Sequence, residues 1–566
     1  MSRTAIFSIY AATILFMAVF FIFPIFSTVK EAFLGQNGQF TTAYLSEVLD
    51  NPLYREGLWN SLRMGVGSTI LSLLIAMPLS LLASRFEFPG KVILTSAILV
   101  PLILPPFVGA IGITQILSPD GAINAFLANL GIINRANPPD WLGSGKLTGV
   151  IIMNALHLYP IFYLNITAAL ANLDPAMEES AANLGCPPWR RFFRITLPLA
   201  MPGIFAGGVI VFIWAFTELG VPLMFQYNRV TSVQIWEGIK DMGGNPIPYA
   251  LVVVTLVVSV IMFLISKKIA GKNEFATSGR AATSSQLRPL SGASAWMATA
   301  AFGIITFIAL LPHIGVVFTA ISTDWYKTVL PTGLTTQNIS DALGHPITLP
   351  SIKNSVIYAS AATLIDVILG VAIAFIITRT KAPGRSLLDS MAMLPLAVPG
   401  LVLAFGYLSV TRDGQPLDFL MIGKHSSPII LLIIAYSMRR LPYIVRSAVA
   451  GFQQTSVSLE EAAQNLGATP LRSLTKITLP LITANLVAGG LLAFSFAMME
   501  VSDSLVLAQR PEDYPIPKTI YILSGNLGNG PALASALGTW SMIFLGVTLV
   551  GASLILGKKL GALFRA

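Results

Sequence analysis

The chain reads EESAANLG at residues 178–185 and EEAAQNLG at residues 460–467, two stretches that lie 282 residues apart. In each copy ITLP follows the glycine at the same interval, at residues 195–198 and 477–480. Because both copies keep the same internal spacing, these stretches predict that the chain is an internal duplication.

Apolar residues dominate the sequence around these stretches. Of the 566 residues, 54% are hydrophobic and 11% are charged, against roughly 25% charged in soluble domains, which excludes a soluble or disordered chain. About twelve apolar stretches reach the roughly 20 residues that a transmembrane helix needs. Their apolar residues are continuous, whereas the strands of a barrel would alternate. The sequence therefore predicts an all-α polytopic membrane protein with about twelve transmembrane helices.

The duplication divides these spans into two sets of six. The residues that recur 294 positions later are Asn60, Ser61, Arg85, Pro101 and Pro105, which match Asn354, Ser355, Arg379, Pro395 and Pro399. Two parallel six-helix repeats predict a pseudo-two-fold axis along the membrane normal, with a pathway between the halves. We expect a first half at residues 1–266, a cytoplasmic linker rich in small residues at 267–292, and a second half at 293–566.

Basic residues indicate the orientation of the chain. Lys267, Lys268 and Lys272 follow the sixth span, and Lys558 and Lys559 follow the twelfth. Because cytoplasmic segments of membrane proteins are enriched in Lys and Arg, both termini are predicted to be cytoplasmic. The net charge of +9 follows from this topology, and no nucleic-acid partner is expected.

Each repeated stretch lies in a predicted cytoplasmic loop between the fourth and fifth spans of its half. The glutamates near its start and the glycine at its end predict a short surface helix. This pattern, Glu-x-Ala with a later Gly and then Ile-x-Leu-Pro, resembles the EAA loop of ATP-binding-cassette (ABC) importer permeases. The first copy departs from the family at Ser180, where the family usually has Ala, a residue of similar small size.

The resemblance covers the whole chain and implies a fused two-half permease of a type I ABC importer in a bacterial inner membrane. It implies that the loops at residues 174–198 and 456–480 form coupling helices that dock on two copies of a cytoplasmic ATPase subunit, while a substrate-binding protein docks outside. ATP and Mg would then bind to the ATPase subunits, so no enzymatic activity and no cofactor are expected in this chain. The implied coupling residues are Glu178, Glu179, Ala181, Gly185, Leu197, Pro198, Glu460, Glu461, Ala462, Ala463, Gly467, Leu479 and Pro480.

Charged residues inside the predicted spans need a reason, because each costs about 2.5–3.5 kcal/mol to insert. Arg439 and Arg440 lie near the middle of the tenth span, and Asp366 lies at a similar depth in the eighth. Two interpretations stay open, a buried ion pair that orders the helices or a positively charged part of the pathway. His157 occupies the position of Arg439 in the first half, so any such charge is asymmetric.

Two glutamates, Glu218 and Glu500, take equivalent positions near the outer ends of the fifth spans, and Asp503 follows the second. They are interpreted either as attracting a cation or closing the pathway as a gate, or as a general feature of these permeases. Carboxylates suit ferric iron, whereas Arg439 and Arg440 suit a phosphate-bearing substrate. These residues therefore do not agree on the charge of the substrate. Fused permeases of this arrangement look most like the ferric-iron importer permeases, and this resemblance makes ferric iron the favoured substrate, with a phosphorylated or phosphonate compound or thiamine as the alternative. No certain metal site is predicted.

A different class of transporter is also compatible with two parallel six-span halves. In an ion-coupled secondary transporter, Asp366 and Arg439 would form a proton or ion relay. The paired EAA loops favour the importer, because a secondary transporter has no ATPase to dock. A membrane-embedded enzyme lacks support, since no His, Cys or carboxylate cluster has catalytic spacing.

Prolines recur within the third span of each half, as Pro101 and Pro105 and again as Pro395 and Pro399. Because proline removes a helical hydrogen bond, these residues predict bends, which are interpreted either as letting the spans move during alternating access or as passive kinks.

Overall fold

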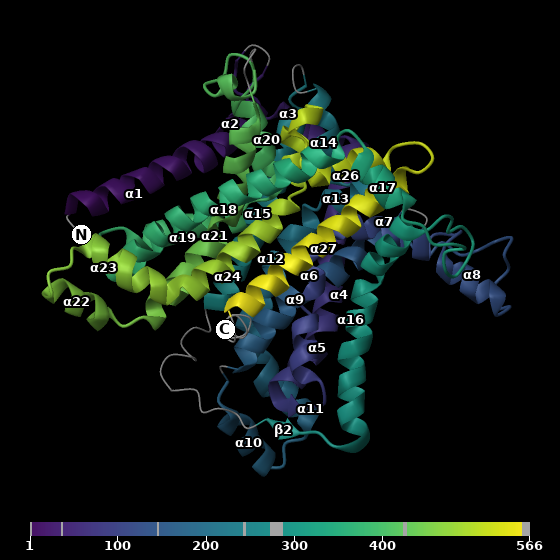
Figure 1. Ribbon diagram of the computed structural model, residues 1–566, viewed down its shortest axis with the longest axis horizontal. Helices are drawn as coiled ribbons and strands as arrows, with labels where there is room; N and C mark the ends of the chain where they lie inside the picture. The colour runs from purple at the N-terminus through teal and green to yellow at the C-terminus, as the bar shows by residue number, and fades with distance from the viewer. Residues whose placement is uncertain are drawn as a thin grey trace. The chain divides into compact units, whose positions relative to one another are not determined.

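The computed structural model describes residues 3–35, 38–143, 146–171, 173–241, 245–271, 287–422 and 427–556. The described chain is helical almost throughout (Figure 1), which confirms the predicted all-α class. Nine of its helices are long and apolar enough to cross a membrane, or eleven when each of two bent helix pairs counts as one span. The predicted count of twelve stays a prediction. The helix at the predicted tenth span, α21 (Ile429–Gln454), carries three arginines and is not among the nine.

The described helices form two compact units that are interleaved in the sequence. One comprises residues 52–234 and 257–338 and is called the first-half unit, and the other comprises residues 1–51, 235–256 and 339–566 and is called the second-half unit. Each unit therefore contains the first helix of the other sequence half. The predicted division at residues 267–292 follows the sequence repeat and stays a prediction, because residues 272–286 lie outside the described part.

The first-half unit is built around three long helices. Its elements are α4 (Pro52–Arg85), β1 (Phe86–Glu87), α5 (Lys91–Ala97), α6 (Val100–Ile103), α7 (Pro106–Leu117), α8 (Ala122–Asn129), α9 (Leu147–Ala171), α10 (Pro175–Asn183), α11 (Pro188–Arg191), η2 (Phe192–Thr196), α12 (Leu197–Phe216), α13 (Gly220–Met224), β2 (Arg288–Pro289) and α16 (Gly292–Ile321). Helices α4, α9 and α12 pack against one another, and α16 packs against α7. The two short strands pair in parallel, so that Phe86 lies opposite Arg288.

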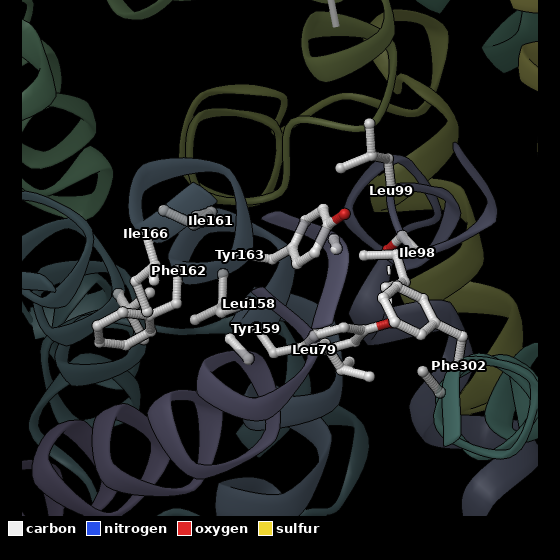
Figure 2. Close-up of a cluster of buried hydrophobic side chains, with 14 of the residues drawn as sticks. Leu79, Ile98, Leu99, Leu158, Tyr159, Ile161, Phe162, Tyr163, Ile166 and Phe302 are labelled. Carbon is white, nitrogen blue, oxygen red and sulfur yellow. Dashed lines mark hydrogen bonds between the residues drawn. The ribbon is translucent and has the colours of Figure 1, made fainter. Parts of the chain in front are cut away.

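Small residues let the three long helices approach closely. Ser68, Ser72 and Ser80 on α4 donate to carbonyl oxygens of α9, at 3.3 to 3.4 Å. Such small polar residues are typical of helix interfaces in membranes. In Figure 2, Leu79 of α4, Tyr159 of α9 and Phe302 of α16 lie in one buried apolar cluster.

The second-half unit repeats this arrangement with α18, α21 and α24, which lie side by side in Figure 1. Its elements are α1 (Arg3–Met17), η1 (Ala18–Ile22), α2 (Phe23–Ala32), α3 (Ala43–Asp50), η3 (Gly238–Asp241), α18 (Thr348–Arg379), α19 (Arg385–Met393), η5 (Leu394–Leu396), α20 (Gly400–Val410), η6 (Asp418–Leu420), α21, α22 (Val457–Asn465), α23 (Pro470–Ser473), η7 (Leu474–Thr478), α24 (Leu479–Met498), α25 (Ser502–Leu507), η8 (Pro511–Asp513), α26 (Ile516–Ser524) and α27 (Gly530–Leu556). Three helices have residues in both units, namely α14 (Thr231–Glu237), α15 (Ile247–Gly271) and α17 (Gln337–Gly344).

The third span of each half is broken, as the prolines predicted. The helices on the two sides of Pro105 meet at 98°, and those on the two sides of Pro399 meet at 97°. Because Pro105 has no N–H, the carbonyl of Pro101 loses its helical donor. The Nδ1 of His157 on α9 lies 2.8 Å from that carbonyl oxygen and replaces the missing donor.

Three π-helical segments in the described chain, η1, η2 and η7, each end two residues before a proline. These prolines are Pro24, Pro198 and Pro480. A proline ring clashes with the carbonyl four residues earlier in an α-helix, and the wider π turn moves that carbonyl away. The Leu-Pro pair that the sequence repeats therefore marks a π turn at the start of the fifth span.

Candidate functional site

Both repeated loops fold into a short helix, as predicted. In the first-half unit α10 begins at the N-cap residue Asp174, whose side chain accepts from the N–H of Ala176 at 2.9 Å. In the second-half unit α22 begins at Ser456, which accepts from the N–H of Ser458 at 3.3 Å. These capped helices are called the coupling helices below.

A glycine ends each coupling helix in a left-handed conformation. Gly185 has φ +78° and Gly467 has φ +89°, which glycine adopts without the steric cost that other residues meet. Nothing lies within 4 Å of a Cβ built on either glycine. The glycines are therefore required by backbone conformation, and the surface beside them is open.

The two adjacent glutamates of each coupling helix differ in exposure, because neighbouring residues on a helix point about 100° apart. Glu460 is 7% exposed, whereas its neighbour Glu461 is exposed. In the first copy Glu178 is half-buried and Glu179 is exposed. One glutamate of each pair therefore points into the protein, and the other is available to a partner.

The inward glutamate of α22 is held by two donors. The Nε of Arg379, the last residue of α18, donates to Glu460 Oε1 at 2.9 Å. The hydroxyl of Thr478, in η7, donates to the same oxygen at 3.0 Å. Arg379 also donates to the carbonyl oxygens of Phe452 and Thr455, at 2.9 and 2.8 Å. The coupling helix is thus bonded to the end of α18 and to the start of the fifth span.

The first-half unit contains the same arrangement at the equivalent positions. Arg85, the last residue of α4, and Thr196, in η2, both donate to Glu178. Arg85 also donates to the hydroxyl oxygen of Thr196 at 3.0 Å. These two sets of three residues are called the Arg–Glu–Thr clamps. The sequence repeat contained both arginines, but their role was missed because helix spacing does not reveal a partner 93 residues away.

An apolar side chain stands out at the end of each coupling helix. Leu184 is 88% exposed and Leu466 is 90% exposed. Further large apolar side chains are exposed at equivalent positions of the two loops, namely Met177 and Trp189 in the first and Leu459 and Leu471 in the second. Isolated exposed leucines are normal, but a repeated group of this kind indicates an interaction surface. This surface was not predicted from the sequence, although the Leu-Gly pair is repeated in both loops.

The other coupling residues lie on or beside these helices. Ala181 and Ala463 are half-buried, and Ala462 is exposed. Leu197 and Pro198, like Leu479 and Pro480, begin α12 and α24 directly after the π turns. The predicted coupling residues are thus gathered at two equivalent places in the fold.

A second charged group lies on the helices of the second-half unit. Arg439 and Arg440 both form ion pairs with Glu500, and Arg439 lies 3.8 Å from Asp503. The predicted pair of Asp366 with these arginines is not formed, because Asp366 instead accepts from Ser437 at 2.6 Å. Residues two apart on a helix point about 200° apart, so Ser437 faces α18 while Arg439 faces elsewhere. Whether this group lines a pathway stays a prediction.

The two glutamates at the ends of the fifth spans have the same structural role. Glu218 Oε1 accepts from the N–H groups of Gly220 and Val221 at 3.0 and 3.2 Å. Glu500 Oε1 accepts from the N–H of Ser502 at 3.2 Å. Each carboxylate therefore caps the turn that follows its span, which favours the general structural interpretation over a cation site.

Comparison with known proteins identifies the family. Residues 68–272 and 366–553 match the family described as binding-protein-dependent transport system inner membrane component. A putative ferric transport system permease of Haemophilus influenzae is 27% identical, over 82% of this chain and 71% of its own length. A probable ABC transporter permease of Sinorhizobium fredii is 25% identical over 95% and 94%.

A shorter relative matches only part of the chain. A molybdenum transport system permease of Escherichia coli is 29% identical, over 38% of this chain and 93% of its own length. The family match occurs twice, in segments that each include one coupling helix and one broken third span, and together these segments cover most of the chain. The chain therefore belongs to the binding-protein-dependent transport system inner membrane component family, as a fused permease with two copies of the family's domain.

Proposed function

We propose that this chain is the transmembrane permease subunit of an ATP-driven importer that carries ferric iron into the cytoplasm. The observation that carries the proposal is the pair of coupling helices, each bonded to two transmembrane helices and each ending in an exposed leucine. Because family members belong to binding-protein-dependent systems, an ion-coupled secondary transporter is no longer a candidate.

The partners follow from the two coupling helices. Each offers one exposed glutamate, Glu179 or Glu461, and one exposed leucine, Leu184 or Leu466. An exposed apolar side chain next to the glycine that ends the helix is suited to insertion into a cleft of a partner protein. We therefore propose two copies of an ATPase subunit, one for each coupling helix. ATP and Mg would bind there, and a substrate-binding protein would deliver the substrate on the opposite side.

The proposed mechanism is alternating access driven by the ATPase subunits. ATP binding draws the coupling helices together, and the long helices bonded to them carry the motion through the membrane. The broken third spans supply bends for this motion. This mechanism places both termini and the coupling helices in the cytoplasm, in agreement with the basic residues that follow the sixth and twelfth spans.

Ferric iron is proposed from the relatives, three of which are named as ferric, or Fe(3+), transport permeases. The charges of Arg439, Arg440, Glu500 and Asp503 cancel, so this group favours neither a cation nor an anion. A phosphorylated or phosphonate compound and thiamine remain the alternatives. The molybdenum permease among the relatives is a reminder that the family fold serves different substrates.

The test is the ATPase activity of the reconstituted complex, titrated with its binding protein preloaded with ferric iron or with a phosphorylated compound. Stimulation by the ferric form alone is the expected result. Stimulation by the phosphorylated form alone would keep the importer and overturn the iron proposal. If ATPase subunits do not bind the permease at all, the coupling role of α10 and α22 is wrong.

A further inference from the structure

The two Arg–Glu–Thr clamps are equivalent in structure although the sequence repeat changes register between their members. Arg85 and Arg379 are 294 residues apart, whereas the clamp glutamates and threonines are each 282 residues apart. The loops between them thus differ in length, yet the same three side chains meet in both units. Because this contact forms in both units in spite of the different loop lengths, it depends on the packing of the helices and not on the length of the connecting loops.

We propose that Arg85 and Arg379 are positioning residues that lock each coupling helix to the end of a transmembrane helix, so that the two move as one body. The proposal rests on the function proposed above and adds the device that transmits the motion. Glu178 and Glu460 accept the hydrogen bonds of the clamps, while their exposed neighbours Glu179 and Glu461 are available to contact the ATPase subunit. The doubled glutamate of the repeat therefore has two separate roles.

The connectivity of α22 explains why a lock is needed. This helix packs against α23 and η7, which are its own neighbours in the chain. Its bond to α18 runs through Arg379, 81 residues away in the sequence. Without this bond, a displacement of α22 would reach α18 only through α21, to which α22 is joined by Thr455 and Ser456. With the clamp closed, the displacement reaches α18 and the fifth span directly.

The chemistry of the clamp suits a rigid joint. Hydrogen bonds between ionised groups are roughly twice as strong as neutral ones, and one carboxylate oxygen of Glu460 receives two donors. Arg379 is fixed in turn by two carbonyl oxygens and by the ring of Phe452, whose centroid lies 5.3 Å from its Cζ. The Nε, one terminal nitrogen and one face of the guanidinium are therefore engaged, which restricts the motion of the arginine.

The two clamps differ in strength. The side chains of Arg379 and Glu460 are 7% and 10% exposed, whereas those of Arg85 and Glu178 are 36% and 28% exposed. Salt and water screen exposed ion pairs more than buried ones. The second-half clamp is therefore the stiffer one, and loss of the same carboxylate should cost more there.

The first experiment measures hydrogen exchange of the coupling helices in the full chain in lipid nanodiscs. In Glu460→Gln we expect amides of α22 to exchange about tenfold faster, because the buried carboxylate that faces Arg379 becomes a neutral amide. The neighbouring change Glu461→Gln is the matched control and should leave them within about twofold. Glu178→Gln should have a smaller effect on α10 than Glu460→Gln has on α22. Equal exchange in Glu460→Gln and Glu461→Gln would overturn the clamp.

The second experiment separates positioning from simple stability. Complexes with the ATPase subunits are reconstituted, and basal and binding-protein-stimulated ATPase rates are compared. We expect Thr478→Val, which removes one donor of the clamp, to keep ATPase binding and the basal rate and to lose stimulation about fivefold or more. Glu460→Gln should lose stimulation at least as strongly. Faster exchange with full stimulation would show a clamp without a transmitting role and would overturn the proposal. Failure of the unmodified chain to bind ATPase subunits would instead overturn the proposed function, while the exchange result would stand.

Discussion

Gly400 begins α20 directly after the break at Pro399, and the guanidinium of Arg439 fills the space where its side chain would be. We expect Gly400→Ala to displace Arg439 from Glu500 and to destabilise the protein by about 3 kcal/mol, because it disrupts a buried ion pair. The matched control is Gly546→Ala in α27, where a Cβ meets nothing within 4 Å. Thermal unfolding of the purified chain in detergent measures both. Equal unfolding temperatures would show that Arg439 can move at no cost.

The acidic partner of Arg439 and Arg440, which is Glu500, could not be predicted from the sequence. Residues at similar depths in two spans suggested Asp366, but depth does not tell which face of a helix a side chain takes. Arg439 and Ser437 lie two positions apart on α21 and serve different neighbours, Glu500 and Asp366. The packing of α21 between α18 and α24 determines which of these two acidic residues pairs with the arginines.

At the scale of the element, the π turns position the clamps. Thr196 is the last residue of η2, and Pro198 follows two positions later. We expect Pro198→Ala to let this π turn become a regular α-helix. Because the register changes by one residue, the residues before it should rotate by about 100°. This rotation should move Thr196 away from Glu178.

Pro202→Ala, further along α12, is the control, because the residues directly before that proline are α-helical. Hydrogen exchange of α10 should rise in Pro198→Ala and stay unchanged in Pro202→Ala. A rise in both variants would mean that α12 as a whole, and not its first turn, holds the coupling helix.

Elements with a strong local signal were predicted well from the sequence. The coupling helices were predicted from their glutamates and glycines, and the broken third spans from Pro105 and Pro399. The exchange of the first helices between the units was not predicted, because a continuous apolar run such as α1 or α16 carries no information about which helices it packs against. The clamps were missed for the same reason, since Arg85 looked like an ordinary basic residue at the end of a span.

At the scale of the whole molecule, fusion of the halves places two coupling helices, the proposed docking points, on one chain. A partner that binds both as a dimer gains from their linkage, because the second contact is intramolecular. We expect Leu466→Asp to weaken binding of the ATPase dimer about tenfold, since burial of a leucine contributes roughly 1.5–3 kcal/mol. The complex should still form through Leu184.

The double variant Leu184→Asp with Leu466→Asp should then lose both contacts, and binding should fall by about a hundredfold or more if the two sites contribute independently. Affinity of the purified permease for the ATPase subunits measures both steps, with Leu527→Asp, an equally exposed leucine outside the coupling loops, as the control. Full binding by the double variant would show that the exposed leucines are not docking residues. Complete loss of ATPase binding in either single variant would show that both coupling helices must bind at the same time. The fused chain would then act as one docking site instead of two.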